Sequence, residues 1–129
     1  MQIPGVEWLG QRTSDEVMAL MKDAACVALP SECYENFPRV IIEAYACGVP
    51  VVATRLGALE ELVQDGQTGC LFRSGDPKGL GEAMRRVVED PVFAEAAGGR
   101  AREVFENHYT ALSQKGLLES IYRSVIDPK

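Results

Sequence analysis

Residues 30–54 read PSECYENFPRVIIEAYACGVPVVAT, and the order of elements in this stretch decides the fold. The apolar run 26–29 before it predicts a strand that ends at Pro30. Pro38 suits the first position of a helix, because its missing amide hydrogen costs nothing there. Gly48 is a natural helix stop, and residues 50–54 predict the next strand. A strand, a loop, a helix and a second strand in this order are typical of a parallel α/β sheet.

The rest of the chain repeats this alternation. Apolar runs predict further strands at 6–9 and 69–72, and Trp8 is expected to pack within the first of them. Capping residues and apolar periodicity predict helices at 14–24, 38–47, 59–63, 77–89, 92–106 and 110–126, with Gly98-Gly99 weakening the fifth. The strands lack strict alternation, as expected when both faces of a sheet are covered. The sequence therefore predicts a Rossmann-like doubly wound parallel sheet with a C-terminal helical tail.

Composition narrows the class of protein. The chain has 129 residues, 47% hydrophobic and 25% charged, and a net charge of −6. That charge argues against a nucleic-acid-binding protein and against a polybasic membrane patch on this segment. No apolar run approaches the ~18 residues that span a bilayer. Residues 1–5 do not resemble the start of a secretory signal, so we expect a cytoplasmic protein.

The cysteines do not predict a metal site. Cys26, Cys33, Cys47 and Cys70 form no CxxC pair, and the single histidine, His108, is distant in sequence. Zinc prefers clustered Cys and His ligands, so none is expected. Cys26 and Cys70 lie in apolar runs and are predicted to be small core residues.

Two glutamates flank the start of the helix predicted after Pro38. The first amides of a helix have no partner within it, and they lie at the positive end of the helix dipole, so they can bind a diphosphate. Glu35 and Glu43 are acceptors suited to sugar and ribose hydroxyl groups on either side. A simpler interpretation is also open: Glu43 pairs with Arg39 on a solvated helix face, and Glu35 is a solvated loop residue.

The same stretch resembles the donor-site signature of retaining GT-B glycosyltransferases of family 4. The family pattern is PS…E-x-FP…EA-x-A-x-G-x-PV-V-A-T, and its elements here are Pro30-Ser31, Glu35, Phe37-Pro38, Glu43-Ala44, Ala46, Gly48 and Pro50 to Thr54. Leu56-Gly57-Ala58, Glu61, Asp65-Gly66 and Thr68-Gly69 resemble the run that follows in the family. Ala58 stands where a second glycine is common, and Leu59-Glu60 replaces a frequent Ile-Pro. The resemblance covers residues 6 to about 125.

The resemblance implies roles for individual residues. Glu35 is the implied catalytic residue, in contact with the transferred sugar. Glu43 is implied to bind the ribose. Donor binding is also implied for Asn36, Phe37, Arg39 and Val40, with the amides of the last three facing the diphosphate or the sugar. Transfer is implied to need no metal or other cofactor and to retain the anomeric configuration.

The resemblance also implies that other parts are needed. The family's C-terminal domain begins two strands earlier, with an Arg and a Lys that hold the donor phosphates, and an N-terminal acceptor-binding domain precedes it. We therefore expect residues 1–129 to be a partial C-terminal nucleotide-sugar-binding domain that works with that missing domain or with a partner chain. The alternative is a stand-alone nucleotide-sugar-binding module without catalysis. The sugar, the nucleotide base and the acceptor cannot be read from the sequence.

Overall fold

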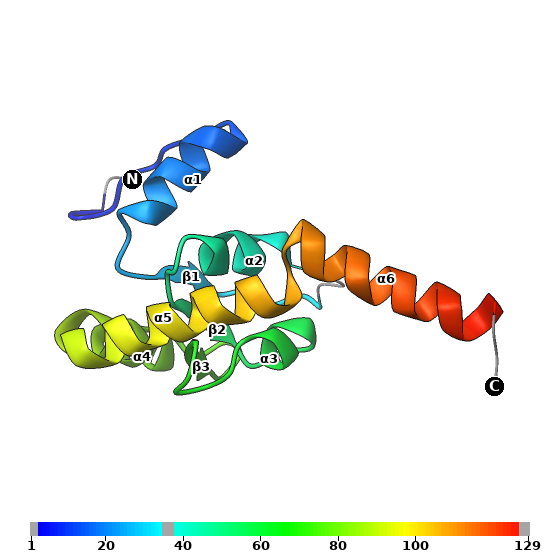
Figure 1. Ribbon diagram of the computed structural model, residues 1–129. Coiled ribbons are helices and arrows are strands. Elements are labelled where there is room, and N and C mark those ends of the chain that lie inside the picture. The colour runs from blue at the N-terminus through cyan, green and yellow to red at the C-terminus, as the bar shows by residue number, and fades with distance from the viewer. Residues whose placement is uncertain (1–2, 35–37, 127–129) are drawn as a thin grey trace.

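A computed structural model describes residues 3–34 and 38–126, and it is an α/β fold (Figure 1). The elements in chain order are α1 (Ser14–Lys22), β1 (Val27–Leu29), α2 (Arg39–Ala46), β2 (Val51–Thr54), α3 (Ala58–Leu62), β3 (Gly69–Phe72), α4 (Pro77–Glu89), α5 (Pro91–His108) and α6 (Ala111–Ile126). The sheet in this described part has three parallel strands in the order β1-β2-β3. Helices cover both of its faces, as a doubly wound sheet requires.

The central strand β2 has a layer of helices packed against each of its two faces. Val51 and Ala53 point into a core shared with α2 and α3, whereas Val52 points to the opposite side. There it joins Cys70 and Phe72 of β3 against α4. All four residues of β2 are buried, which explains why its sequence shows no polar alternation.

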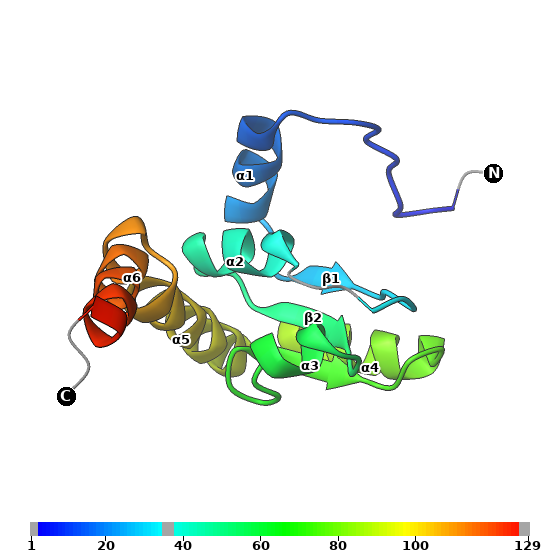
Figure 2. The ribbon, with the colours of Figure 1, turned by 90° about the vertical axis from the view of Figure 1, so that its right-hand side faces the viewer.

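Helix α5 crosses the sheet's amino edge and contacts both cores. Its first turns place Phe93 and Ala94 against the α4 side, and its later turns place Ala101 and Phe105 against the α2 side. Figure 2 shows α5 at the end of the strands opposite their arrowheads. The two glycines expected to weaken this helix are accommodated within it, and Gly98 is buried.

Helix termini follow the local sequence signals. Thr13 and Glu16 form the capping box predicted for α1. Asp76 and Asp90 accept backbone hydrogen bonds at the starts of α4 and α5, each followed by a first-turn proline. Pro38, predicted at the first helical position, is instead the N-cap of α2, with extended backbone angles of φ −78° and ψ 94°.

The first predicted strand is wrong. Residues 6–9 form no strand, and Trp8, expected to pack, is 92% exposed. A strand needs a neighbour for its backbone hydrogen bonds, and no strand of the described residues lies beside this segment. In Figure 2 the segment runs apart from the sheet. The sheet therefore has three strands within the described ranges, not four.

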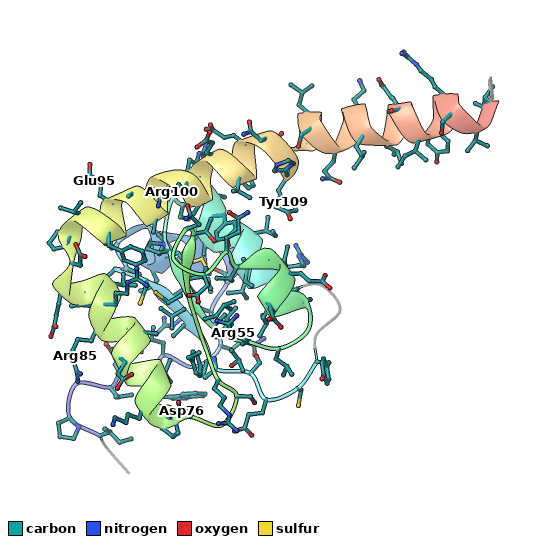
Figure 3. The ribbon with its side chains drawn as sticks, turned by 90° about the horizontal axis from the view of Figure 1, so that it is seen from below. Arg55, Asp76, Arg85, Glu95, Arg100 and Tyr109 are labelled. Atoms are coloured by element: carbon teal, nitrogen blue, oxygen red, sulfur yellow. The ribbon has the colours of Figure 1, made fainter. Side chains whose placement is uncertain are left out.

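The C-terminal helical tail is confirmed. Helix α6 has no buried residue and projects away from the rest of the fold (Figures 1 and 3). Its apolar side chains, among them Leu117, Ile121 and Val125, are at least half exposed. No helix in the described ranges is both long enough and apolar enough to span a membrane.

Candidate functional site

The carboxyl edge of the sheet is where the chain leaves all three strands. The Thr54 hydroxyl donates to the Leu29 carbonyl at 3.3 Å, which joins the last residues of β2 and β1. The amide of Arg55 donates to the Phe72 carbonyl at 2.8 Å, which joins β2 to the last residue of β3. These bonds fix the starting points of the three loops. Ligands of open α/β sheets bind beyond this edge.

Helix α2 begins at this edge, because it follows β1 in a parallel sheet (Figure 2). Its inner face buries Ile41, Ala44 and Tyr45 completely, so the helix is held firmly against the sheet. Its N-cap is a proline, which supplies no side-chain acceptor for the amides of the first turn. No acidic residue of the helix lies in that turn either. Arg39 and Val40 lie in this first turn, where backbone amides have no carbonyl partner within the helix.

The predicted site residues divide into two groups. Glu35, Asn36 and Phe37 lie outside the described residues. Arg39 is exposed and Val40 half-buried in the first turn of α2, and Glu43 is half-buried one turn further on. The structure therefore brings Arg39 and Val40 to the carboxyl edge of the sheet. Among the described residues no ion pair joins Arg39 to Glu43, so the simpler interpretation of Glu43 gains no support.

A contact between two loops was not anticipated from the sequence. The Tyr34 ring lies so close to Gly57 that a Cβ there would be 2.7 Å from Cδ1 of the ring. Gly57 is the N-cap of α3 and has φ +53° and ψ −129°, a conformation that side-chain-bearing residues rarely adopt. The contact brings the loop that leaves β1 against the loop that leaves β2. The glycine in the Leu56-Gly57-Ala58 run was the available signal, but its aromatic partner was not identifiable.

Arg55 forms ion pairs with two carboxylates that follow β2 in the chain. Its guanidinium lies 3.0 Å from the Asp65 carboxylate and 3.6 Å from that of Glu60 in α3. The other oxygen of Asp65 accepts from the Leu71 amide at 3.0 Å, on the outer side of β3. Figure 3 shows Arg55 close to α3. Because these groups are about half exposed, their charges contribute mainly to loop geometry, with little effect on stability.

A cavity of about 150 Å³ lies beside this edge, between the start of the β1 loop and the start of α4. Its lining includes Pro30, Glu32, Phe72 and Asp76. Small-molecule sites usually enclose ~300–1,000 Å³, so this cavity is too small to hold a nucleotide sugar.

The thiols follow the prediction for core cysteines. Cys70 is buried and Cys26 half-buried, and burial raises the pKa of both thiols. A raised pKa keeps a thiol protonated and unreactive at neutral pH. Within the described ranges there is also no group of three His, Cys, Asp or Glu side chains that could hold a metal ion.

Comparison with known families gives one match over most of the chain. Residues 2–90 match the family described as glycosyl transferases group 1. The chain is 34% identical over 121 residues to N-acetyl-alpha-D-glucosaminyl L-malate synthase of Bacillus anthracis, covering 94% of this chain and 31% of that protein. It is 38% identical over 96 residues to glycogen synthase of Mycobacterium tuberculosis, covering 74% of this chain and 23% of that protein.

Solved structures show the same relationship. Sucrose-phosphate synthase of Thermosynechococcus elongatus superimposes with a TM-score of 0.81 at 30% identity, over 94% of this chain and 30% of that one. Anabaena Alr3699/HepE, in a complex with UDP and glucose, superimposes with a TM-score of 0.81 at 29% identity, over 92% of this chain and 32% of that one. The predicted fold class, part of a GT-B fold, is confirmed. The chain spans about a third or less of these proteins.

Proposed function

The chain belongs to the glycosyl transferases group 1 family, and on that premise we propose that it supplies the donor-binding part of a retaining glycosyltransferase of family 4. The donor is a nucleoside-diphosphate sugar. The observation that carries the proposal is the position of α2, whose uncapped first turn begins at the carboxyl edge of a parallel sheet. That is where a fold of this class binds a diphosphate.

The diphosphate interacts with the amides of Arg39 and Val40. The leaving nucleoside diphosphate gains negative charge as the glycosidic bond breaks, and fixed amide dipoles stabilise that charge without having to reorganise. Because backbone donors and the helix dipole do this, the proposed reaction needs no metal ion or other cofactor. Phe37 and Asn36 complete the donor site in this proposal.

The two glutamates bind hydroxyl groups at opposite ends of the donor. Glu43 accepts hydrogen bonds from the ribose, and Glu35 accepts them from the transferred sugar. Half-burial of Glu43 supports this, since an acid that is partly withdrawn from water and forms no ion pair with Arg39 gains most from a bound diol. The catalytic role of Glu35 follows from its place in the family motif.

The acceptor is held by a separate domain or a partner chain in the intact enzyme. The chain spans about a third or less of the relatives it matches, and this supports the proposal because the remaining length of such a protein can hold the acceptor. We propose a cytoplasmic enzyme. The related Alr3699/HepE structures contain UDP and UDP-glucose, which makes these two ligands the first probes to use.

The experiment is a titration of the intact protein with UDP and UDP-glucose, then with other nucleotide sugars, followed by transfer assays with candidate acceptors. The variant is Glu43→Gln, and the matched control is Glu95→Gln on the exposed side of α5. Loss of hydrogen bonds to a charged group predicts a donor affinity about 10- to 100-fold lower for Glu43→Gln and unchanged for the control. Equal affinities in the two variants would rule out the ribose role. Donor binding without transfer to any acceptor would favour the stand-alone binding module instead.

A further inference from the structure

The end of α2 that lies far from the proposed donor site is in direct backbone contact with α5. A Cβ added to Gly98 would lie 2.4 Å from the carbonyl oxygen of Gly48 and 3.8 Å from Cδ of Pro50. Gly48 follows Cys47, the C-cap of α2, and has φ +69°; a Cβ added there would lie 3.6 Å from the Gly98 carbonyl oxygen. There is no room for a side chain at Gly98, whereas a Cβ at Gly48 would make an ordinary contact but would be strained by the positive φ. At this point the separation of α5 from the end of α2 is therefore set by main-chain atoms.

Arg102, one turn further along α5, holds the same end of α2. Its guanidinium donates to the carbonyl of Ala46, the last residue of α2. The side chain is kept in place by an ion pair of 2.9 Å with Glu106 and by the ring of Phe105, 5.3 Å from the guanidinium carbon. A cation at the C-terminus of a helix also complements the negative end of its dipole.

These contacts fix the position of the opposite end of α2. The helix has eight residues and is about 12 Å long, so it transmits a displacement of one end to the other as a rigid rod. We propose that Gly98 and Arg102 are positioning residues for the donor diphosphate. In this inference, which rests on the proposed function, the two residues set how far the amides of Arg39 and Val40 reach beyond the carboxyl edge of the sheet.

Only a small displacement of α2 is compatible with hydrogen bonds between its first amides and the diphosphate. A methyl group at Gly98 needs the contact with Gly48 to open by roughly 1 Å to reach ordinary van der Waals distance. Hydrogen bonds from amides to oxygen span only about 2.7–3.2 Å, so a shift of that size breaks or weakens those to the diphosphate. The neighbouring Gly99 is exposed, and a Cβ added there meets no atom within 4 Å. It provides a matched control in the same helix turn.

The experiment compares Gly98→Ala with Gly99→Ala in the intact protein. The measurements are the dissociation constant for UDP, KM for donor and acceptor, kcat, and thermal denaturation to choose a temperature at which both variants are folded. We expect Gly98→Ala to weaken UDP binding and raise the donor KM about tenfold, with acceptor KM unchanged. Gly99→Ala should match the wild type in UDP affinity, in both KM values and in kcat, and its melting temperature should be equal or higher because alanine favours the helix.

Arg102 gives a second test that does not depend on Gly98→Ala folding. Arg102→Ala should raise the donor KM, and Arg102→Lys, which keeps a cationic donor, should restore part of the difference. A lower melting temperature for Gly98→Ala and Arg102→Ala with unchanged UDP affinity and donor KM would show a purely structural role and overturn the inference. If the wild type itself binds no UDP or other nucleoside diphosphate, the proposed function fails instead, so the two failures are distinguishable.

Discussion

The hydroxyl oxygen of Tyr45, on the inner face of α2, lies 2.7 Å from that of Thr68, and both side chains are fully buried. The Tyr45 hydroxyl donates its single proton to the Leu62 carbonyl at 2.9 Å, so Thr68 is the donor to Tyr45. Thr68 in turn accepts from the Gln64 amide at 3.0 Å. This chain of hydrogen bonds joins α2 to the segment between α3 and β3, and it satisfies polar groups that burial would otherwise penalise.

The first prediction concerns Tyr45 and alkaline pH. Burial raises the pKa of its phenol to about 12 from the ordinary value of 10.0. Because the unfolded chain ionises at the lower value, this contribution to stability is fully present below about pH 10 and is lost as pH rises to about 12. The free energy of unfolding of the wild type should fall by about 2–3 kcal/mol more than that of Tyr45→Phe across this window. Urea denaturation at several pH values measures the difference, and parallel profiles would contradict it.

The second prediction tests the contact between Tyr34 and Gly57. Gly57→Ala combines backbone strain with a clash against the ring, and it should cost about 1–3 kcal/mol of stability. Gly75→Ala is the control, because Gly75 also has a positive φ but open space around it. In a double-mutant cycle, Tyr34→Ala should recover the part of the Gly57→Ala loss that comes from the ring. Strict additivity of the two substitutions would show that the ring does not constrain Gly57.

Much of the fold could be predicted because its signals are local. The strand at residues 69–72 and the helix that begins after Asp76 have the predicted bounds, since a short apolar run and an Asp-Pro cap each specify their element directly. Residues 6–9 carry a similar apolar run, but a strand also depends on a partner strand that such a run does not specify. Trp8 was misplaced for the same reason.

The candidate site was predictable only in part. Pro38 and the apolar face of α2 were sufficient to place Arg39 and Val40 at the sheet edge. The close approach of Gly98 to Gly48 was not predictable, because a glycine in a helical pattern indicates low helix propensity and does not show what lies opposite it. The assignments to Glu35, Asn36 and Phe37 stay predictions.

The third prediction is that donor binding does not require a metal ion. Helix amides and their dipole bind the diphosphate in the proposed site, so a chelator should leave the donor KM of the intact enzyme unchanged. The measurement compares the donor KM with and without excess EDTA, with added Mg²⁺ as the control. Loss of donor binding on chelation, restored by Mg²⁺, would contradict the proposal.

The fourth prediction concerns residues 1–129 as an isolated chain. They should show no transferase turnover, because catalysis requires an acceptor held against the anomeric carbon. They should also self-associate, since Val6, Trp8 and the apolar side chains of α6 are exposed. Activity assays with the donor and acceptor of the intact enzyme, together with light scattering, test both points. Turnover near the rate of the intact enzyme by a monomeric chain would be the opposite result.

The most direct test of the donor site is the affinity of the intact protein for UDP-glucose and other nucleotide sugars, measured by calorimetry for the wild type, Glu35→Gln, Glu43→Gln and the control Glu95→Gln. We predict saturable binding of at least one nucleotide sugar by the wild type and the control. Affinity should be at least about tenfold lower for each of the other two variants, since each loses hydrogen bonds from a charged group to donor hydroxyls. Failure of the wild type to bind any nucleoside-diphosphate sugar, or equal binding by all four proteins, would contradict a donor site at the start of α2.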